Sequence, residues 1–235
     1  MAAIKHIPTP YSYSEAVAAS DFVFLSGHLV FGDSFPASLD GTFPSIIKTL
    51  AKFGLKPENL VKIHVSFRDV KDLPEFEKSF KKWFPGTIHP VVRYGSSTHL
   101  NAKILAIIDG IAYRKEVKMS TVKHVPTPFS YSAAVGAGDY VFLGLHRGFG
   151  KDFTTQFHET FKYLKKTLAE FDLTLADIVK VNVWLKNIDD VRIYEKLFED
   201  YFEKDKFPAR MGATTQFIDA DCLLMIDGVA YRNKD

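Results

Sequence analysis

KHIPTPYSYS at residues 5–14 returns as KHVPTPFSYS at residues 123–132, with eight of ten positions identical. A second pair, IDGIAYR at 108–114 and IDGVAYR at 226–232, matches at six of seven positions. Both pairs have the same offset, because 123 − 5 and 226 − 108 are each 118. A period this long with only two copies indicates a duplicated domain rather than a solenoid. We therefore predict two domains, residues 1–118 and 119–235.

The composition is that of an ordinary globular protein, with 46% hydrophobic and 25% charged residues in a chain of 235. A net charge of +2 does not indicate the clustered basic face that nucleic-acid binding usually needs. No apolar run reaches the roughly 18 residues of a membrane span, and the N-terminus lacks the apolar region of a signal peptide. The single cysteine, Cys222, allows no disulfide within the chain. We expect a cytoplasmic protein with no nucleic-acid or membrane partner.

Each copy predicts the same series of elements, most clearly seen in the second. Alternating apolar residues and turn residues predict strands at 129–137, 139–145, 178–185, 210–217 and 222–231. Helical spacing of apolar residues predicts helices at 153–171 and 191–202. In the first copy, Pro44 predicts that the first helix begins near that residue. The order is β-β-α-β-α-β-β, an α+β unit in which both helices cover one face of the sheet.

The last strand, 222–231, is largely apolar on both of its faces. The second face of the sheet should therefore be covered, and neither helix is available for it. The other copy or a neighbouring subunit is the natural cover, so the pattern predicts a homo-oligomer.

An ordered set of short motifs carries a family resemblance. Tyr-Ser-x-Ala-Val stands at 13–17 and 131–135, Ser-Gly-His at 26–28, and Phe-Pro-Ala-Arg at 207–210. The set resembles the reactive intermediate deaminase (RidA or YjgF) family over nearly the whole chain, twice. The resemblance implies a chorismate-mutase-like fold, a trimeric or pseudo-hexameric assembly, and ligand clefts between neighbouring units.

The resemblance also implies roles for residues. Arg210 is expected to hold the carboxylate of a small enamine or imine substrate, because a guanidinium makes two parallel hydrogen bonds to a carboxylate. Glu195 stands where the family commonly has Asn, and it is a displaced general base, a salt-bridge partner of the arginine, or a solvated residue. The other candidate substrate-binding residues are Tyr13, Gly27, His28, Glu77, Arg93, Tyr131 and His146.

The two copies depart from the family pattern at different places. Val92 falls opposite Arg210, and Arg93 would point away from the cleft unless a one-residue bulge turned it back. Leu145 replaces the glycine that Gly27 supplies in the first copy. A cleft built from Tyr13 and Gly27 of one copy and Arg210 of the other would be complete.

A third departure affects catalysis. Ile107 and Met225 stand where deaminases that resemble this pattern carry a water-activating glutamate. An apolar side chain cannot transfer a proton. Asp109 and Asp227, two positions along the same strands, either replace that glutamate or serve the structure.

Three functions remain open. The first is an enzyme that acts on a small carboxylated imine, enamine or related intermediate, by hydrolytic deamination or a diverged reaction. The second is a non-catalytic ligand-binding or scaffolding protein. The third, a ribonuclease, is disfavoured by the weak basic character and the lack of a catalytic histidine pair. The eight histidines show no metal-ligand spacing, so we expect neither a metal nor a cofactor.

Overall fold

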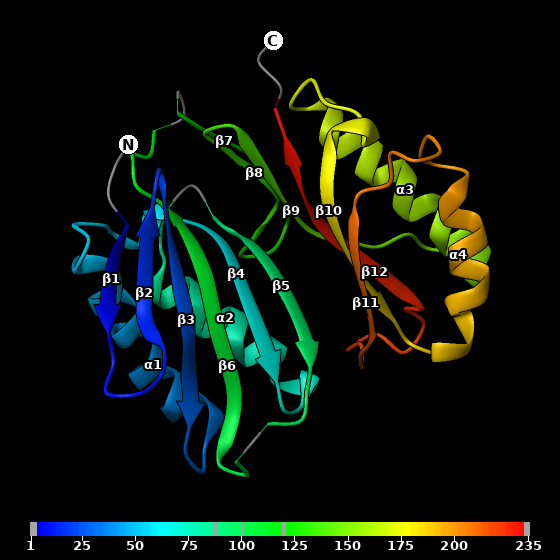
Figure 1. Cartoon of the computed structure of the whole chain (residues 1–235). Helices are drawn as coiled ribbons and strands as arrows, with labels where there is room; N and C mark the ends of the chain where they lie inside the picture. The colour runs from blue at the N-terminus through cyan, green and yellow to red at the C-terminus, as the bar shows by residue number, and fades with distance from the viewer. Residues whose placement is uncertain (1–3, 87–88, 100, 119–120, 233–235) are drawn as a thin grey trace.

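The computed structural model describes residues 4–86, 89–99, 101–118 and 121–232 (Figure 1). Repeat 1, the first copy, contains β1 (Lys5–Pro8), β2 (Ser14–Ala19), β3 (Phe22–Phe31), α1 (Phe35–Ala51), β4 (Leu60–Phe67), α2 (Leu73–Trp83), β5 (Val91–Ser96) and β6 (Ile104–Tyr113). Repeat 2 contains β7 (Val122–Pro126), β8 (Ser132–Ala137), β9 (Tyr140–His146), α3 (Phe153–Ala169), β10 (Ile178–Leu185), α4 (Val191–Glu199), β11 (Ala209–Thr214) and β12 (Leu224–Tyr231). The predicted domain boundary adjoins residues 119–120, which lie outside the described residues.

The predicted α+β class is confirmed, with one additional strand in each repeat. In Figure 1, α1 and α2 lie behind the strands of repeat 1, and α3 and α4 lie on the outer side of repeat 2. The additional strands, β1 and β7, come from the repeated motif itself and pair with β2 and β8. They are short and each ends at a proline, which fits an edge strand because proline has no N–H to donate.

The strands of both repeats form one sheet, in the order β1-β2-β3-β6-β4-β5-β8-β9-β12-β10-β11, with β7 beside β8. The repeats join where β5 meets β8 in parallel, at Val91 and Ser132. Among the described strands, this order ends at two free edges: β1–β2 of repeat 1 and β11 of repeat 2. One free edge therefore belongs to the first strands of repeat 1, and the other belongs to a strand near the end of repeat 2.

The start of α1 differs from the prediction. The helix begins at Phe35, with Pro36 in its first turn, and runs through Pro44. Proline is favourable in a first turn, but inside a helix it costs about 3 kcal/mol. The helix continues through Pro44 because its apolar stripe is buried against the sheet, which offsets that cost: Phe35, Leu39, Phe43, Ile46 and Leu50.

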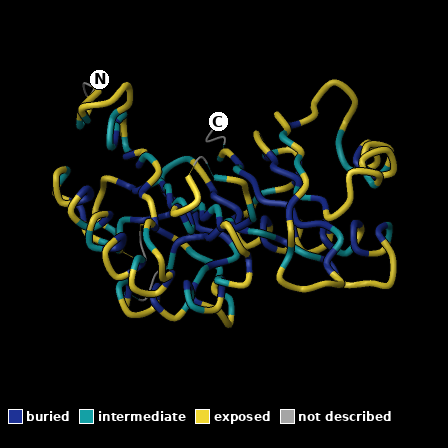
Figure 2. Tube along the Cα trace, turned by 90° about the horizontal axis from the view of Figure 1, so that it is seen from below, coloured by how far each residue is buried: buried dark blue, intermediate teal, exposed yellow. Residues whose placement is uncertain are grey.

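Each repeat has its own core, and a third cluster joins them. Phe43 in repeat 1 and its counterpart Phe161 in repeat 2 are both at most 1% exposed and pack among other aromatic rings. The third cluster combines both repeats: Phe22, Val61, Val91, Tyr113, Val122, Val135, Ala137 and Phe142. Figure 2 shows buried chain running through both units and across the place where they join.

The second face of the sheet is only partly covered by the other repeat. Tyr113 and Phe142, from different repeats, are buried where the repeats meet. In contrast, Phe24, Leu29 and Phe31 on β3 remain 47%, 48% and 51% exposed. The expectation that the other repeat covers this face therefore holds near β5 and β8 but not at β3.

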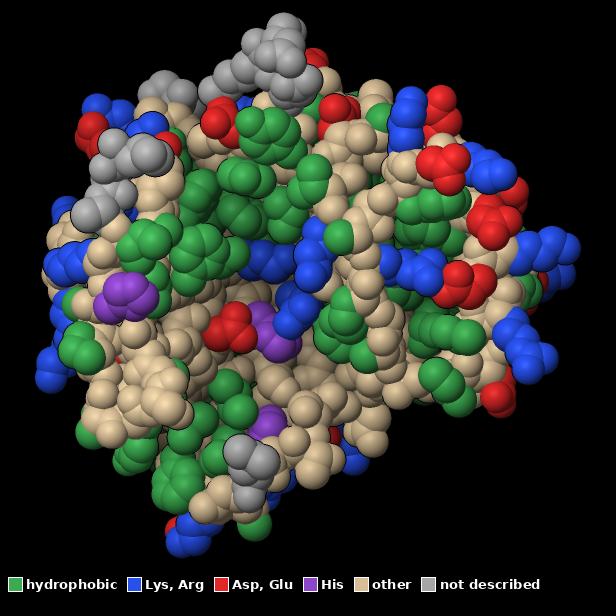
Figure 3. All heavy atoms as spheres, in the orientation of Figure 1, with side chains coloured by type: hydrophobic (Ala, Val, Ile, Leu, Met, Phe, Trp, Pro, Cys, Tyr) green, Lys and Arg blue, Asp and Glu red, His purple; other side chains and the backbone are tan. Residues whose placement is uncertain are grey.

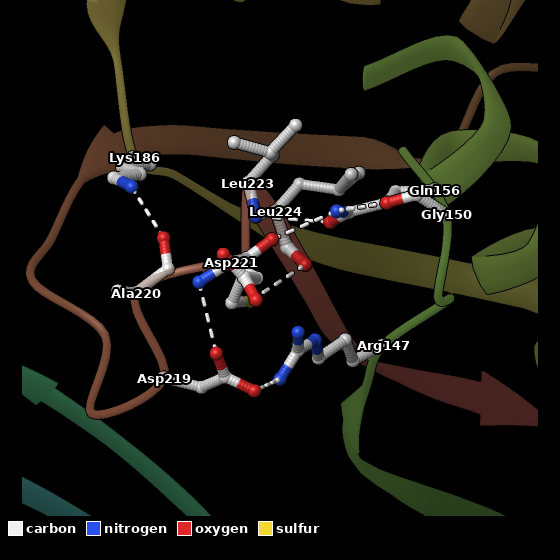
Figure 4. A network of polar contacts seen from close by, with 10 residues as sticks. Arg147, Gly150, Gln156, Lys186, Asp219, Ala220, Asp221, Leu223 and Leu224 are labelled. Carbon is white, nitrogen blue, oxygen red and sulfur yellow. Dashed lines mark hydrogen bonds and ion pairs between the residues drawn. The ribbon is translucent and has the colours of Figure 1, made fainter. Parts of the chain in front are cut away.

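The segment between β11 and β12 crosses to repeat 1. Thr215 Oγ1 accepts a hydrogen bond from the Ser96 N–H at 2.9 Å. Farther along, Figure 4 shows the segment held by Arg147, which pairs with Asp219, and by Gln156, whose side chain bonds to the backbone of 221 and 223. The fixed segment places Cys222, which is fully buried, against the repeat 1 core.

Ser132 offers a direct test of the junction. Its hydroxyl is buried and donates to the His89 carbonyl at 2.6 Å. We expect Ser132→Ala to lower the free energy of unfolding by about 1–2 kcal/mol, because that carbonyl then loses its donor among the described residues. The control is Ser97→Ala, whose exposed hydroxyl donates to the adjacent Thr98 carbonyl at 3.4 Å and whose loss should cost less than about 0.5 kcal/mol. Equal losses in urea denaturation would contradict a stabilising role for this contact.

Candidate functional site

The junction between the repeats is where three of the departures from the family pattern meet. Val92 and Met225 are 1% and 6% exposed and belong to one core cluster, against which Leu145 and Tyr131 also pack. At this junction an arginine, a glutamate and a glycine of the family pattern are thus replaced by Val92, Met225 and Leu145. The replacements fill the space with apolar side chains.

The ionisable groups beside this junction are shielded from water. Burial raises the pKa of the Tyr94 hydroxyl to about 12 and raises the pKa of Tyr131 as well. Burial also raises the pKa of Glu77, with Lys81 acting in the opposite direction. Glu77 and Tyr131, two of the predicted binding residues, thus lie next to a packed apolar contact rather than an open cleft.

Arg210 lies at the free β11 edge. Its guanidinium pairs with Glu195 and lies over the rings of Tyr194 and Phe198, at 5.1 and 5.3 Å from their centroids. The arginine side chain is 31% exposed, and a groove of about 360 Å³ opens beside it, lined also by Phe207. Aromatic faces hold the guanidinium in place while part of it stays available to an anion.

Tyr13 and Gly27 line a larger groove, of about 760 Å³, at the other free edge of the sheet. Tyr13 is 54% exposed and stacks on Tyr11. A Cβ on Gly27 would lie 2.7 Å from Ile107 Cγ2, so this backbone approaches Ile107 as only glycine can. The groove therefore keeps the glycine that repeat 2 has lost.

His28 and His146 have the same internal role in their repeats. In each, Nδ1 bonds to the carbonyl two residues earlier, and Nε2 bonds to Thr49 Oγ1 or Thr167 Oγ1 at 3.1 or 2.8 Å. Burial lowers the pKa of both imidazoles. Both rings are therefore neutral at pH 7 and have both nitrogens engaged within the fold.

The cleft predicted from Tyr13, Gly27 and Arg210 does not form within one chain. Gly27 lies on β3, near one free edge, and Arg210 lies on β11, the other free edge. The strand order places them at opposite ends because the internal junction uses the other two edges, β5 and β8. Within a single chain these predicted binding residues thus lie apart, toward opposite ends of the sheet.

The Arg93 side chain does not lie on the face of β5 that the helices cover. The register between β4 and β5 has no bulge, so Arg93 faces away from Val92 and Glu77. It lies instead over the ring of Trp184, 5.0 Å from the centroid. The bulge that would have turned it toward the Glu77 side is absent because β5 pairs continuously with β4.

Asp227 is the centre of a polar cluster on that opposite face. It is fully buried and accepts hydrogen bonds from Lys62, Asn182 and Trp184, each at 2.9 Å. Burial alone would raise the pKa of Asp227, but Lys62, Arg93 and the Trp184 N–H together hold it below its ordinary value. Lys62 comes from repeat 1, so this ion pair ties the repeats together. Sequence reasoning missed Lys62 and Trp184, which look like ordinary alternating strand residues.

Among the described residues, no group of three or more His, Cys, Asp or Glu side chains is arranged to hold a metal ion. None of the described helices is long and apolar enough to cross a membrane.

The fold defines a tandem α+β protein, two copies of one unit that share a sheet. The family model described as Endoribonuclease L-PSP matches residues 4–113 and 123–232, and the chain belongs to this family. It is a tandem duplication of the RidA/YjgF unit. A RutC family protein of Pyrococcus horikoshii is 29% identical over 122 residues, covering 47% of this chain and 94% of the relative. The mitochondrial protein MMF1 of Saccharomyces cerevisiae is 29% identical over 84 residues, covering 33% and 58%.

Solved structures resemble either one unit or both. A YjgF/YER057c/UK114 family member from Mycobacterium tuberculosis matches with a TM-score of 0.45 and 23% identity, covering 47% of this chain and 99% of that one. A chorismatase matches with a TM-score of 0.67 and 13% identity, covering 92% of this chain and 76% of that one. The second likeness extends over both repeats and concerns the fold alone.

Proposed function

We propose that the chain binds a small carboxylate in a cleft that two copies complete, with Arg210 of one copy facing Tyr13 and Gly27 of the other. The observation that carries this proposal is where the departures from the family pattern lie in the sheet. Val92, Leu145 and Met225 all lie at the internal junction, while the arginine and the glycine are kept at the free edges. A head-to-tail contact between copies would repeat the internal junction, with Ala209 beside Ser14 in place of Val91 beside Ser132.

The proposed reaction is the hydrolysis of a small imine, in which water adds to the C=N carbon and ammonia leaves as the carbonyl forms. Arg210 would hold the substrate carboxylate through two parallel hydrogen bonds. Glu195 is in contact with Arg210 and half exposed, so it is the carboxylate available to take a proton from water. Ile107 lies at the other half of this cleft, where the family pattern has its glutamate, and it supplies no such group.

The role of Arg210 can be tested on 2-aminoacrylate generated enzymatically, with pyruvate formation as the readout. We expect the wild-type chain to speed this conversion and Arg210→Ala to lower kcat/KM by at least about 100-fold, since a charge-assisted pair to the carboxylate is lost. Arg210→Lys should recover only part of the loss, because lysine lacks the paired donors. Equal rates for wild type, Arg210→Ala and buffer would exclude this reaction.

Mixing two variants tests whether the cleft is shared between copies. Arg210→Ala and Tyr13→Ala should each bind carboxylate weakly alone. A mixture in which the subunits have exchanged should recover binding, because some contacts then pair an intact Arg210 edge with an intact Tyr13 edge. A mixture no better than its components, or a wild-type chain that stays monomeric at assay concentrations, would contradict the shared cleft.

A second candidate function is ligand binding without catalysis. The apolar Ile107 and Met225 favour it, because neither can activate water. Saturable, Arg210-dependent carboxylate binding with no pyruvate formation would select this alternative.

A further inference from the structure

Three side chains form a row across neighbouring strands of repeat 1, on the face opposite the helices. His64 on β4 is the register partner of Arg93 on β5 and of Asp109 on β6. Their neighbours Ile63, Val92 and Ile108 point the other way, into the core. Adjacent strands lie about 4.8 Å apart, so the three side chains start from positions within reach of one small molecule.

Two members of the row form a hydrogen-bonded dyad. His64 Nδ1 donates to Asp109 Oδ2 at 2.9 Å, and the two side chains are 23% and 45% exposed. A carboxylate that accepts from Nδ1–H leaves the lone pair of a neutral imidazole on Nε2. That Nε2 makes no hydrogen bond to any residue in the described part of the chain.

The third member is a guanidinium with no hydrogen-bonded partner among the described residues. Arg93 lies over the Trp184 ring at 5.0 Å, and its Nε is buried and unpaired among the described residues. The nearby Asp227 is already engaged by Lys62, Asn182 and Trp184. Arg93 is therefore positioned by packing, and within the described part of the chain no hydrogen bond uses its donors. An unpaired buried donor is costly, and a bound anion would satisfy it.

The equivalent row in repeat 2 shows that the fold does not require the arginine and the histidine. Adding 118 to Arg93, His64 and Asp109 gives Met211, Asn182 and Asp227. The same strands form there with Met and Asn at two of the three positions. Figure 3 shows charged and histidine side chains gathered around a hollow near the middle of this face, with hydrophobic side chains around it.

We propose that Arg93, His64 and Asp109 form a second binding site, for a small carboxylate that carries a hydroxyl or amino group next to its carboxyl carbon. Arg93 binds the carboxylate, and His64 Nε2 accepts a hydrogen bond from the neighbouring group, with Asp109 orienting the ring. The site belongs to a single chain and uses neither Arg210 nor the free edges. It is therefore independent of the cleft proposed above.

The test uses lactate and propionate, which differ in the hydroxyl group, and the fluorescence of Trp184 as reporter. The chain has two tryptophans, so Trp83→Phe leaves Trp184 as the only indole, in contact with the proposed ligand-binding arginine. We expect saturable quenching by both acids, with lactate the tighter. Arg93→Met should weaken both acids by about tenfold or more, and His64→Asn should weaken lactate while leaving propionate unchanged.

The two substitutions copy the residues of repeat 2, and Arg93→Lys gives a second variant that keeps the charge. Lys151→Met removes an exposed cation elsewhere and should leave both affinities unchanged. Arg210→Met tests the other proposal separately and should leave the Trp184 signal intact. Loss of the signal in Arg210→Met, no saturation with either acid, or unchanged affinities in Arg93→Met would each overturn the second site.

Discussion

Asp227→Asn should lower the free energy of unfolding by about 3–5 kcal/mol, the typical cost of removing one partner from a buried ion pair. The carboxylate is fully buried, and its partner Lys62 is only 11% exposed at the side chain. Asn keeps the shape and one acceptor oxygen but leaves the buried Lys62 ammonium without its counter-charge. Urea denaturation followed by circular dichroism measures the loss.

The double variant Lys62→Met/Asp227→Asn is the control, because it removes the stranded ammonium. It should recover at least half of the loss, since a buried ion pair replaced by uncharged groups is often nearly neutral. A double variant as unstable as Asp227→Asn would mean that the hydrogen bonds from Asn182 and Trp184, not the charge, dominate.

The same pair predicts a dependence on pH. The folded pKa of Asp227 is lowered, so its ionisation stabilises the fold fully above the unfolded value of about 3.9. That stabilisation is lost as the pH falls through the folded pKa. The stability difference between wild type and Asp227→Asn should therefore be constant from pH 7 to about 5 and shrink below about 4. A difference that grew toward acid pH would contradict this assignment.

Phe43→Ala should cost about 3–5 kcal/mol, because it opens a cavity in a packed aromatic cluster. Phe43 is fully buried, and its ring lies within 5.2–6.0 Å of those of Phe76, Phe80 and Phe84. Phe43→Leu, which keeps most of the volume, should cost less than about 1.5 kcal/mol. Calorimetry and denaturant titration give the two values.

Phe161→Ala is the matched variant in repeat 2. Because β5 pairs with β8 and a shared apolar cluster joins the repeats, both variants should shift one common unfolding transition. Two separate transitions in either variant would show that the junction does not couple the repeats.

Much of the fold was accessible from the sequence, and the exceptions have physical reasons. The 118-residue offset predicted the repeated unit, and Gly138, which has a φ of +58°, lies at the turn between the strands predicted at 129–137 and 139–145. The strands β1 and β7 were missed because four or five residues ending in proline lack a clear alternation. The start of α1 was wrong because tertiary burial outweighed the local preference of Pro44.

The sites were less predictable, since they depend on which edges meet. The sequence identified Val92 and Leu145 as departures, but only the pairing of β5 with β8 shows that they fill the same junction. Likewise, strand alternation correctly indicated that Arg93 points away from Val92, but not that Trp184 of the other repeat would lie beneath it. Contacts between repeats leave no periodic pattern in either strand alone.

The filled internal junction affects ligand stoichiometry. In a closed assembly, each chain of two units accounts for one contact between its own repeats and one contact with the next chain. If both kinds of contact held a ligand, each chain would bind two molecules. With Val92, Leu145 and Met225 occupying one of those contacts, only the contact proposed between chains remains for the proposed Arg210 cleft. Titrations that depend on Arg210 should therefore saturate at no more than one ligand for each chain, half the number expected from counting family units.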